Sequence, residues 1–396
     1  MGKMRYTKKF GSLALVGLLS TAVLAACGDE EGSSNDADTI KIGANLELSG
    51  GVAIYGSSVL DGAELAIEEI NANGGIDGKQ IELVQADNKS ENAEATSAAL
   101  KLIEQDNVVA MIGPATSGNT AATVELAAEN KIPLITASGT APNITVNDKG
   151  EVNEYAFRTC FIDPFQGTVA ANFATTELSA KNVAIFGDNA SDYAKGLAKS
   201  FKEQIQANGG KVVGEESYVA KDTDFRTQLT NIKGKNPDFI FIPGYYEEVG
   251  LIVKQARELG ITVPLMGADG WDSPTLVELA GGDALNNTFI TNHYSSEDPD
   301  DTIQKFVEAF KADNDDTAPN AFNALGYDTV YYLADAIDRA DSLDGEAIKN
   351  ALEETKDLSL VTGTFSIDEN HNPVKSATVL EFVNGAQVFN SKVDPQ

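Results

Sequence analysis

Histidine, cysteine and tryptophan are scarce in this chain of 396 residues, which contains two, two and one of them, respectively. Neither His293 nor His371 has other metal-ligating residues near it at the usual spacing, so the sequence gives no basis for a histidine-based zinc site. A Ser-His-Asp triad would also have to use one of these two histidines. We therefore expect no catalytic residue, no metal site and no cofactor.

Basic residues are also few, with 29 Lys and Arg against 60 Asp and Glu and a formal net charge of −31. Such a surface repels nucleic acid and anionic lipid headgroups, so we expect no nucleic-acid partner and no polybasic docking to a membrane. Hydrophobic residues make up 42% of the chain, which predicts a packed core. The length is sufficient for two domains of ordinary size.

The first 26 residues have the pattern of a secretory signal. They begin with four basic residues and continue in an apolar run from about Leu13 to Ala26, which is too short for a comfortable transmembrane span. The sequence Leu24-Ala25-Ala26-Cys27 resembles the lipobox of bacterial lipoproteins, in which the cysteine thiol is acylated. We expect cleavage before Cys27 and a lipid anchor on it, outside the bacterial cell membrane. The alternative, an uncleaved anchor, would leave the protein in the same place.

The other cysteine, Cys160, then has no partner, so no disulfide framework supports the fold. It lies in the apolar segment 157–161, which predicts a buried and inert thiol. Residues 27–38 are small and acidic and predict a flexible tether.

Apolar strands and amphipathic helices alternate from residue 40 onward. A strand at 40–44 precedes a helix whose apolar residues fall on one face between Val59 and Ile70, and a further strand follows at 81–84. A second round starts at 183–186, and both rounds contain an Ala-Asn-Gly-Gly sequence that stops a helix. The repeated order predicts an α/β fold with two lobes, each a parallel sheet with helices on both faces.

We expect the chain to cross between the lobes several times. Lobe 1 is predicted from residues 39–157 plus 291–364, and lobe 2 from residues 158–290 plus 365–396. Several short crossings, rather than one flexible linker, predict a stiff hinge with a defined closing motion.

Small, hydroxyl-rich loops follow three strands of the first lobe, at residues 45–56, 113–119 and 136–142. Each loop is expected to open a helix, whose free N–H groups and neighbouring hydroxyls bind a small anion such as a carboxylate. The alternative is that these hydroxyls only cap helices. The candidate binding residues in the last two loops are Ser117, Ser138, Gly139 and Thr140.

Aromatic and acidic residues follow the strands of the second lobe instead. Asp269 is a candidate acceptor for a cation, and Tyr193 and Tyr245 are candidate walls for an apolar group. Trp271 is as consistent with a binding wall as with a residue that anchors the core. One lobe that binds a carboxylate and one that binds an ammonium group together predict a zwitterionic ligand, a free amino acid.

Seven short segments in order carry a resemblance to a known family. From Ile40 to about Phe389 the chain resembles type I bacterial solute-binding proteins for branched-chain amino acids. The segments are Ile54-Tyr55-Gly56, Ile112-Gly113-Pro114, Thr140-Ala141-Pro142, Phe165-Gln166-Gly167, Thr223-Asp224-Phe225, Pro243-Gly244-Tyr245 and Gly270-Trp271-Asp272-Ser273-Pro274.

The resemblance implies two Rossmann-like lobes with three hinge crossovers and no cofactor. It also implies that the ligand carboxylate meets Ser117 and Thr140, and that the ammonium group meets the Ser138 carbonyl, Thr140 and Asp269. Three tyrosines would line the rest of the site: Tyr55, Tyr193 and Tyr245. Where some relatives have glutamate, this chain has Asp269, whose carboxylate reaches about one methylene less far, so the preferred amino acid stays open.

The implied function is that of a monomeric substrate-binding lipoprotein that delivers an aliphatic amino acid to the permease subunits of an ABC importer. Relatives that bind amides, urea or aromatic acids keep those ligands open as alternatives. A ligand-sensing lipoprotein and a structural surface lipoprotein are further alternatives. An extracytoplasmic hydrolase is a weaker one, because it would need a carboxylate pair in place of histidine.

Overall fold

The computed structural model describes residues 39–394. The predicted signal, the predicted lipid anchor on Cys27 and the predicted tether lie outside the described residues. Among residues 39–394, no helix is both long enough and apolar enough to span a membrane.

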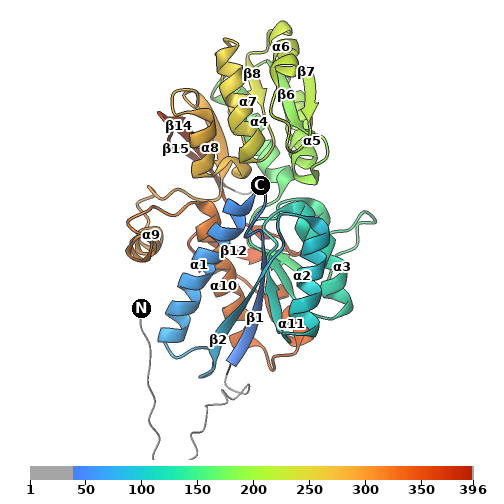
Figure 1. Cartoon of the computed structure of the whole chain (residues 1–396), viewed down its shortest axis with the longest axis vertical. Helices are drawn as coiled ribbons and strands as arrows, with labels where there is room; N and C mark the ends of the chain where they lie inside the picture. The colour runs from blue at the N-terminus through green and yellow to red at the C-terminus, as the bar shows by residue number, and fades with distance from the viewer. Residues whose placement is uncertain (1–38, 395–396) are drawn as a thin grey trace, which may run out of the picture. The chain divides into compact units, whose positions relative to one another are not determined.

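The first sheet has five parallel strands in the order β2-β1-β3-β4-β5. The central strands are short, apolar and fully buried, as a sheet covered on both faces requires. Figure 1 shows α1 and α10 on one side of β1 and β2, and α2 and α3 on the other. The bounds are β1 Thr39–Leu46, β2 Gln80–Asp87, β3 Ala110–Ile112, β4 Leu134–Thr136, β5 Ala156–Arg158, α1 Ala53–Ala72, α2 Asn92–Glu104, α3 Ser117–Glu129 and α10 Ala321–Arg339.

The second sheet has seven strands in the order β15-β14-β10-β9-β8-β6-β7. Strands β6 to β10 are parallel to their neighbours, whereas β14 is antiparallel to β10 and β15 is antiparallel to β14. The bounds are β6 Asn182–Asp188, β7 Lys211–Tyr218, β8 Phe239–Phe241, β9 Leu265–Gly267, β10 Thr288–Asn292, β14 Ala377–Val383, β15 Ala386–Val393, α4 Asp163–Thr176, α5 Asp192–Ala207, α6 Arg226–Gly234, α7 Tyr246–Glu258 and α8 Pro274–Ala280.

The chain passes between the two large sheets three times: after β5, after β10 and before β14. A small antiparallel sheet, β11-β12-β13, lies just before the third passage. The prediction of an α/β fold with two largely parallel sheets flanked by helices is confirmed. The remaining bounds are α9 Asp301–Asp313, α11 Gly345–Glu353, β11 Leu358–Leu360, β12 Gly363–Ile367, β13 Pro373–Val374, and the 3₁₀ helices η2 Pro142–Ile144 and η3 Asp269–Trp271.

One expected helix is missing from the first sheet. The loops after β1 and β3 lead into α1 and α3, as predicted, but the loop after β4 leads only into the single turn η2. The prediction that all three loops open a helix was therefore wrong for residues 136–142. Two backbone N–H groups of this loop already have acceptors in the protein, since Gly139 N donates to Thr136 Oγ1 and Ala141 N donates to Ser117 Oγ.

Helices α1 and α10 approach each other closely because glycines meet backbone atoms at the crossing. A Cβ atom built on Gly326 of α10 would lie 2.1 Å from the carbonyl oxygen of Val59 in α1, and one built on Gly62 would lie 1.9 Å from that of Asn323. Real Cβ atoms do not approach backbone that closely, so only glycine fits at these two positions.

We expect Gly326→Ala to lower the free energy of unfolding by about 1–3 kcal/mol, because the added methyl group forces α1 and α10 apart. Gly234→Ala is the matched control: it also lies in a helix, α6, and its Cβ would meet nothing within 4 Å. The control should leave stability unchanged or raise it by up to about 1 kcal/mol. Thermal unfolding followed by circular dichroism checks both variants, and equal melting temperatures would contradict the packing argument.

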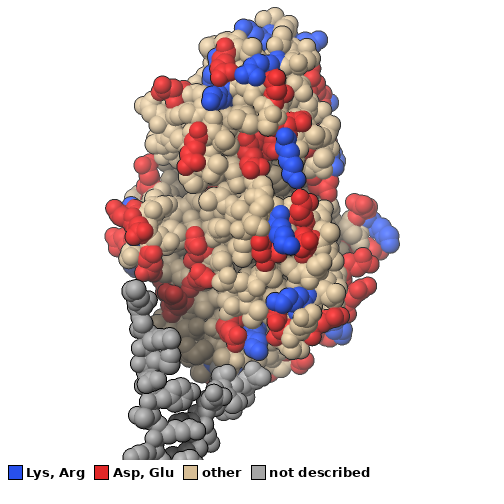
Figure 2. All heavy atoms as spheres, in the orientation of Figure 1, with Lys and Arg blue, Asp and Glu red and all other residues tan. Residues whose placement is uncertain are grey.

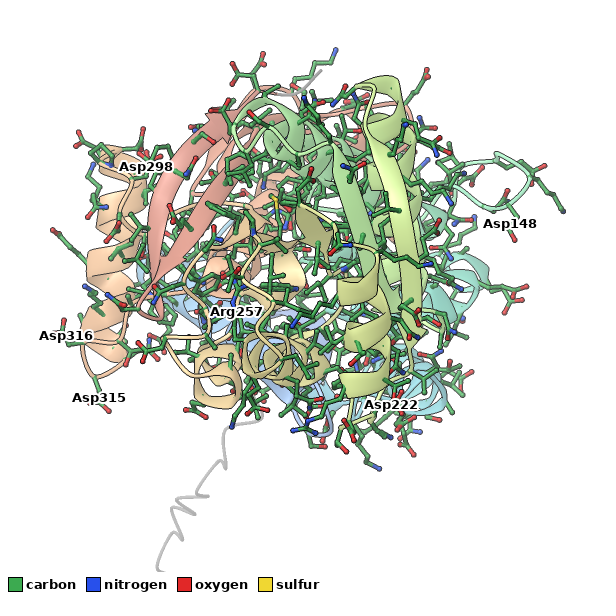
Figure 3. The ribbon with its side chains drawn as sticks, turned by 90° about the horizontal axis from the view of Figure 1, so that it is seen from above. Asp148, Asp222, Arg257, Asp298, Asp315 and Asp316 are labelled. Carbon is green, nitrogen blue, oxygen red and sulfur yellow. The ribbon has the colours of Figure 1, made fainter. Side chains whose placement is uncertain are left out.

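Acidic side chains dominate the surface. Figure 2 shows carboxylates spread across the visible face rather than gathered in one patch. In Figure 3 the labelled Asp148, Asp315 and Asp316 lie at the outer edge, on loops that project away from the sheets. Arg257 lies further in, and its guanidinium group donates to five backbone carbonyl oxygens between residues 261 and 287.

Candidate functional site

A cavity lies where loops from the carboxyl ends of the two large sheets face each other, which is the usual ligand position in open parallel sheets. It contains about 220 Å³ of space between atoms, of which only about 10 Å³ is open to the centre of a water molecule. That is room for about one water. The lining residues are Tyr55, Ala115, Thr116, Ser117, Ser138, Tyr193, Tyr245, Asp269, Gly270 and Phe322.

The first sheet contributes hydroxyl groups to this cavity. Ser117 is the first residue of α3, and its Oγ accepts a hydrogen bond from Ala141 N at 3.1 Å. Ser138 follows β4, and its Oγ donates to Ala115 O at 2.8 Å. Both side chains are buried, so their positions are fixed by loop contacts within the first sheet.

Glu47 holds the loop that carries Ser117. Its buried carboxylate accepts hydrogen bonds from Ala115 N, Thr116 N, Thr116 Oγ1 and Asn119 Nδ2 at 2.7–3.1 Å. The N–H groups of Ala115 and Thr116 are thus occupied by a carboxylate of the protein itself. The expectation that this loop offers free N–H groups was therefore wrong for these two residues.

Asp269 is the acidic centre on the side of the second sheet. Its Oδ1 accepts hydrogen bonds from Tyr193 Oη at 2.8 Å, Gln166 Nε2 at 3.0 Å and Gly270 N at 3.1 Å. Its Oδ2 lies 3.1 Å from Nε2 of His293. The carboxylate is buried and is held by residues of α4, α5 and the segment after β10.

Aromatic rings form the remaining walls. Tyr193 and Tyr245 stack with ring centroids 5.1 Å apart, and Tyr55 stacks on Phe322 at 4.4 Å. Burial raises the pKa of Tyr55, Tyr193 and Tyr245 above the usual tyrosine range, so all three stay neutral hydrogen-bond donors. The cavity therefore combines hydroxyl groups, one carboxylate and a large aromatic surface.

The two sides of the cavity are already in contact. Tyr55 Oη donates to the carbonyl oxygen of Gly270, and Tyr246 Oη donates to Gly51 O at 3.0 Å. These bonds join loops of the first sheet to loops of the second. A ligand of amino-acid size can enter only when these facing surfaces separate or their side chains rotate.

Three predicted binding residues do not line the cavity. Trp271 is fully buried, and its Nε1 donates to Ile242 O at 3.0 Å, so it anchors the core of the second lobe. Gly139 and Thr140 are buried in a segment held by Arg158, which donates to the carbonyls of Gly139 and Ala141 at 2.8 and 2.9 Å. The structure brings together the other six: Tyr55, Ser117, Ser138, Tyr193, Tyr245 and Asp269.

Sequence reasoning missed several residues at or beside this site: Glu47, Asp163, Gln166, His293 and Phe322. Asp163, the first residue of α4, is fully buried, and neither of its carboxylate oxygens has a hydrogen-bond partner among the described residues. Burial raises the pKa of Asp163 well above the usual range. The available signal was its position two residues before the segment Phe165-Gln166-Gly167, which carried the resemblance.

The prediction of a buried Cys160 is confirmed. The residue is fully buried, and burial raises the pKa of its thiol to about 12. Within residues 39–394, no three His, Cys, Asp or Glu side chains are grouped so as to hold a metal ion.

The family model described as periplasmic binding protein matches residues 39–387. This chain belongs to that family. Membership places it among extracytoplasmic solute-binding proteins rather than enzymes, and the resemblance found in the sequence is confirmed.

Solved structures and curated sequences agree with this assignment. A branched-chain amino acid transporter substrate-binding protein, LivJ from Streptococcus pneumoniae in complex with isoleucine, is 44% identical, with a TM-score of 0.84 over 90% of this chain and 100% of that chain. A leucine-binding protein, LivK from Thermotoga maritima, is 38% identical, with a TM-score of 0.85 over 90% and 99%. The leucine-, isoleucine-, valine-, threonine- and alanine-binding protein of Pseudomonas aeruginosa is 30% identical over 368 residues, or 93% of each chain.

Proposed function

We propose that this protein captures a branched-chain amino acid between its two lobes and delivers it to the permease of an ABC importer. The observation that carries the proposal is the cavity in which Ser117 and Ser138 face Asp269 across three tyrosines. The names of the relatives support it, because the Streptococcus protein was crystallised with isoleucine and the Thermotoga protein is described as leucine-binding.

Each part of a zwitterionic amino acid has a counterpart in this cavity. The hydroxyl group of Ser117, whose oxygen accepts from Ala141 N, keeps its proton for the ligand carboxylate, and Asp269 suits the ammonium group. The rings of Tyr55 and Phe322 offer an apolar face to an aliphatic side chain. Charge-assisted hydrogen bonds in a site from which water is excluded are stronger than exposed ones. A micromolar affinity requires only about 8 kcal/mol, which a few such contacts provide.

A hinge at the three passages would open and close this cavity, with residues 39–157 plus 291–364 moving against residues 158–290 plus 365–396. Lys375, just before β14, supports such a hinge because its buried Nζ donates to Thr159 O at 3.1 Å and to Thr362 Oγ1. It ties the first passage to the segment before the third. Burial lowers the pKa of Lys375 to about 8, and the nearby Asp328 opposes that shift.

The lipobox-like sequence supports an anchor on Cys27, which would hold a monomeric receptor beside the membrane permease. Mass spectrometry of the mature protein tests this part separately. An acylated N-terminal cysteine is the expected product, and an unmodified terminus elsewhere would contradict the anchor.

A thermal-shift screen tests the proposed ligand. We expect L-leucine, L-isoleucine or L-valine to raise the melting temperature most, because a ligand at 100 times its dissociation constant stabilises the protein by about 2.7 kcal/mol. D-leucine serves as the matched control, since it has the same composition but cannot place all three groups at once. Benzoate and urea represent the aromatic acids and the urea that other members of the family bind. A response to one of those, and none to the three amino acids, would contradict the proposal.

A further inference from the structure

His293 lies where the chain leaves the second sheet, directly after β10, and its side chain is 1% exposed. Its sequence context indicates neither a catalytic nor a metal-binding role. In the structure its Nε2 lies 3.1 Å from Oδ2 of Asp269, the carboxylate that faces the cavity. The imidazole therefore contacts the candidate ammonium-binding group directly.

Packing fixes the orientation of this ring. One face stacks on Phe161, with ring centroids 3.8 Å apart and planes inclined by 21°. The backbone N–H of His293 donates to Asn292 Oδ1 at 2.8 Å. Nδ1 is buried and has no hydrogen-bond partner among residues 39–394. Because the carboxylate can only accept, the tautomer with its proton on Nε2 is the one that makes this contact.

The donors to Asp269 are divided between its two oxygens. Tyr193, Gln166 and Gly270 all donate to Oδ1, whereas His293 donates to Oδ2. A turn of the carboxylate about its Cβ–Cγ bond moves both oxygens, so the donors on Oδ1 resist it. The donor on Oδ2 adds a hydrogen bond at the other oxygen, so that both oxygens are held in place.

We propose that His293 is the positioning residue of the ammonium-binding site: its neutral imidazole donates from Nε2 to Asp269 and fixes the carboxylate that receives the amino group of the ligand. This inference rests on the proposed function and assigns one residue within that site. The imidazole acts through Asp269 and does not itself touch the ligand.

The charges around the ring favour its neutral form. Burial lowers the pKa of His293 to about 4, although the hydrogen bond and charge of Asp269 act in the opposite direction. Lys375, on the segment before β14, lowers the pKa further, while Phe161, which stacks on the ring, carries no charge. A second cavity beside His293 is lined by three further charged residues: Asp298, which Figure 3 labels, Asp300 and Lys392. A neutral ring leaves the negative charge of Asp269 available to an ammonium group, whereas a protonated ring would compete with it.

Two substitutions of His293 distinguish the effect of its hydrogen-bond donor from the effect of its stacked ring. His293→Gln keeps an amide donor, and His293→Phe keeps the stack on Phe161 but removes the donor. We expect calorimetry at pH 7.5 to show L-leucine affinity reduced tenfold or more in the Phe variant and within threefold of wild type in the Gln variant. Equal affinity of the Phe variant and wild type, or equal losses in both variants, would overturn the proposal.

Nuclear magnetic resonance gives a readout that does not depend on these variants. The chain has only two histidines, so protein labelled with ¹⁵N-histidine gives two imidazole spectra, and His371→Asn assigns them. We expect His293 to remain the Nε2–H tautomer at pH 5, where an ordinary histidine with a pKa of about 6.5 is protonated, and its Nε2–H signal to shift when L-leucine binds. If the His293 ring titrates near pH 6.5, or if its Nε2–H signal does not shift when L-leucine binds, the proposed positioning role is overturned. This result does not require the Phe variant to fold. Failure of the proposed function looks different, because wild type would then bind no L-leucine.

Discussion

Asp269→Asn should weaken the binding of L-leucine by about 100-fold or more. The substitution removes the negative charge from a carboxylate that is buried beside the cavity and keeps the size of the side chain. Its remaining oxygen can still accept from Tyr193 and Gln166. Loss of one partner from a buried, hydrogen-bonded charge pair costs about 2–5 kcal/mol, and each 1.4 kcal/mol corresponds to a factor of ten. Isothermal titration calorimetry measures the change.

Asp283→Asn is the control for this variant, because Asp283 is an exposed residue between α8 and β10 in the same part of the chain. It changes the net charge by the same amount and should leave the dissociation constant within about twofold. If Asp269→Asn also binds L-leucine with wild-type affinity, Asp269 does not contact the ligand.

Glu47→Ala should cause the largest loss of stability. The substitution leaves Ala115 N, Thr116 N and Asn119 Nδ2 without their buried acceptor. Each unsatisfied buried donor costs about 1–3 kcal/mol, and partial relaxation of the loop reduces the sum, so we expect a loss of about 3–5 kcal/mol. For a domain of 150–250 residues, 1 kcal/mol shifts the melting temperature by about 2–4 °C, so the expected decrease is about 10 °C.

Differential scanning calorimetry without ligand measures this decrease, and Glu104→Ala is its control. Glu104 is the exposed last residue of α2, where substitution changes stability by less than about 0.5 kcal/mol. A decrease of less than 2 °C in the Glu47 variant would mean that the carboxylate does not hold the loop that carries Ser117.

The fold could be predicted because its signals are local. Strands such as β3 and β8 are short apolar runs, and α1 and α5 both end at an Asn-Gly sequence, so each element is readable without its neighbours. The six predicted residues that line the cavity also follow from local order, because each lies in a loop after a strand or at the helix start beyond it. Parallel strands bring such loops to one edge.

The rest of the site depends on contacts between distant segments. Glu47 meets Ala115 across 68 residues, and His293 meets Asp269 across 24. No pattern of residue spacing in a single sequence predicts either contact. For Trp271 the sequence left both roles open, because nothing local shows whether an indole in a glycine-flanked loop faces a cleft or the core. In the structure its Nε1 donates to the carbonyl of Ile242, and the ring is buried.

Tyr55 and Gly270 are hydrogen-bonded across the cavity. The affinity for a ligand therefore depends on the difference between the contacts that the lobes make with the ligand and the contacts that they make with each other. Every contact that the lobes make with each other must be replaced or rearranged when an amino acid enters, so stronger self-contact reduces the fraction of molecules ready to bind. Exposed pairs at the rim, such as Lys221 with Glu91 at 3.5 Å, contribute to that balance without touching the ligand. Substitutions at the rim can therefore change the affinity for the ligand during evolution, while the residues inside the cavity determine the ligand specificity.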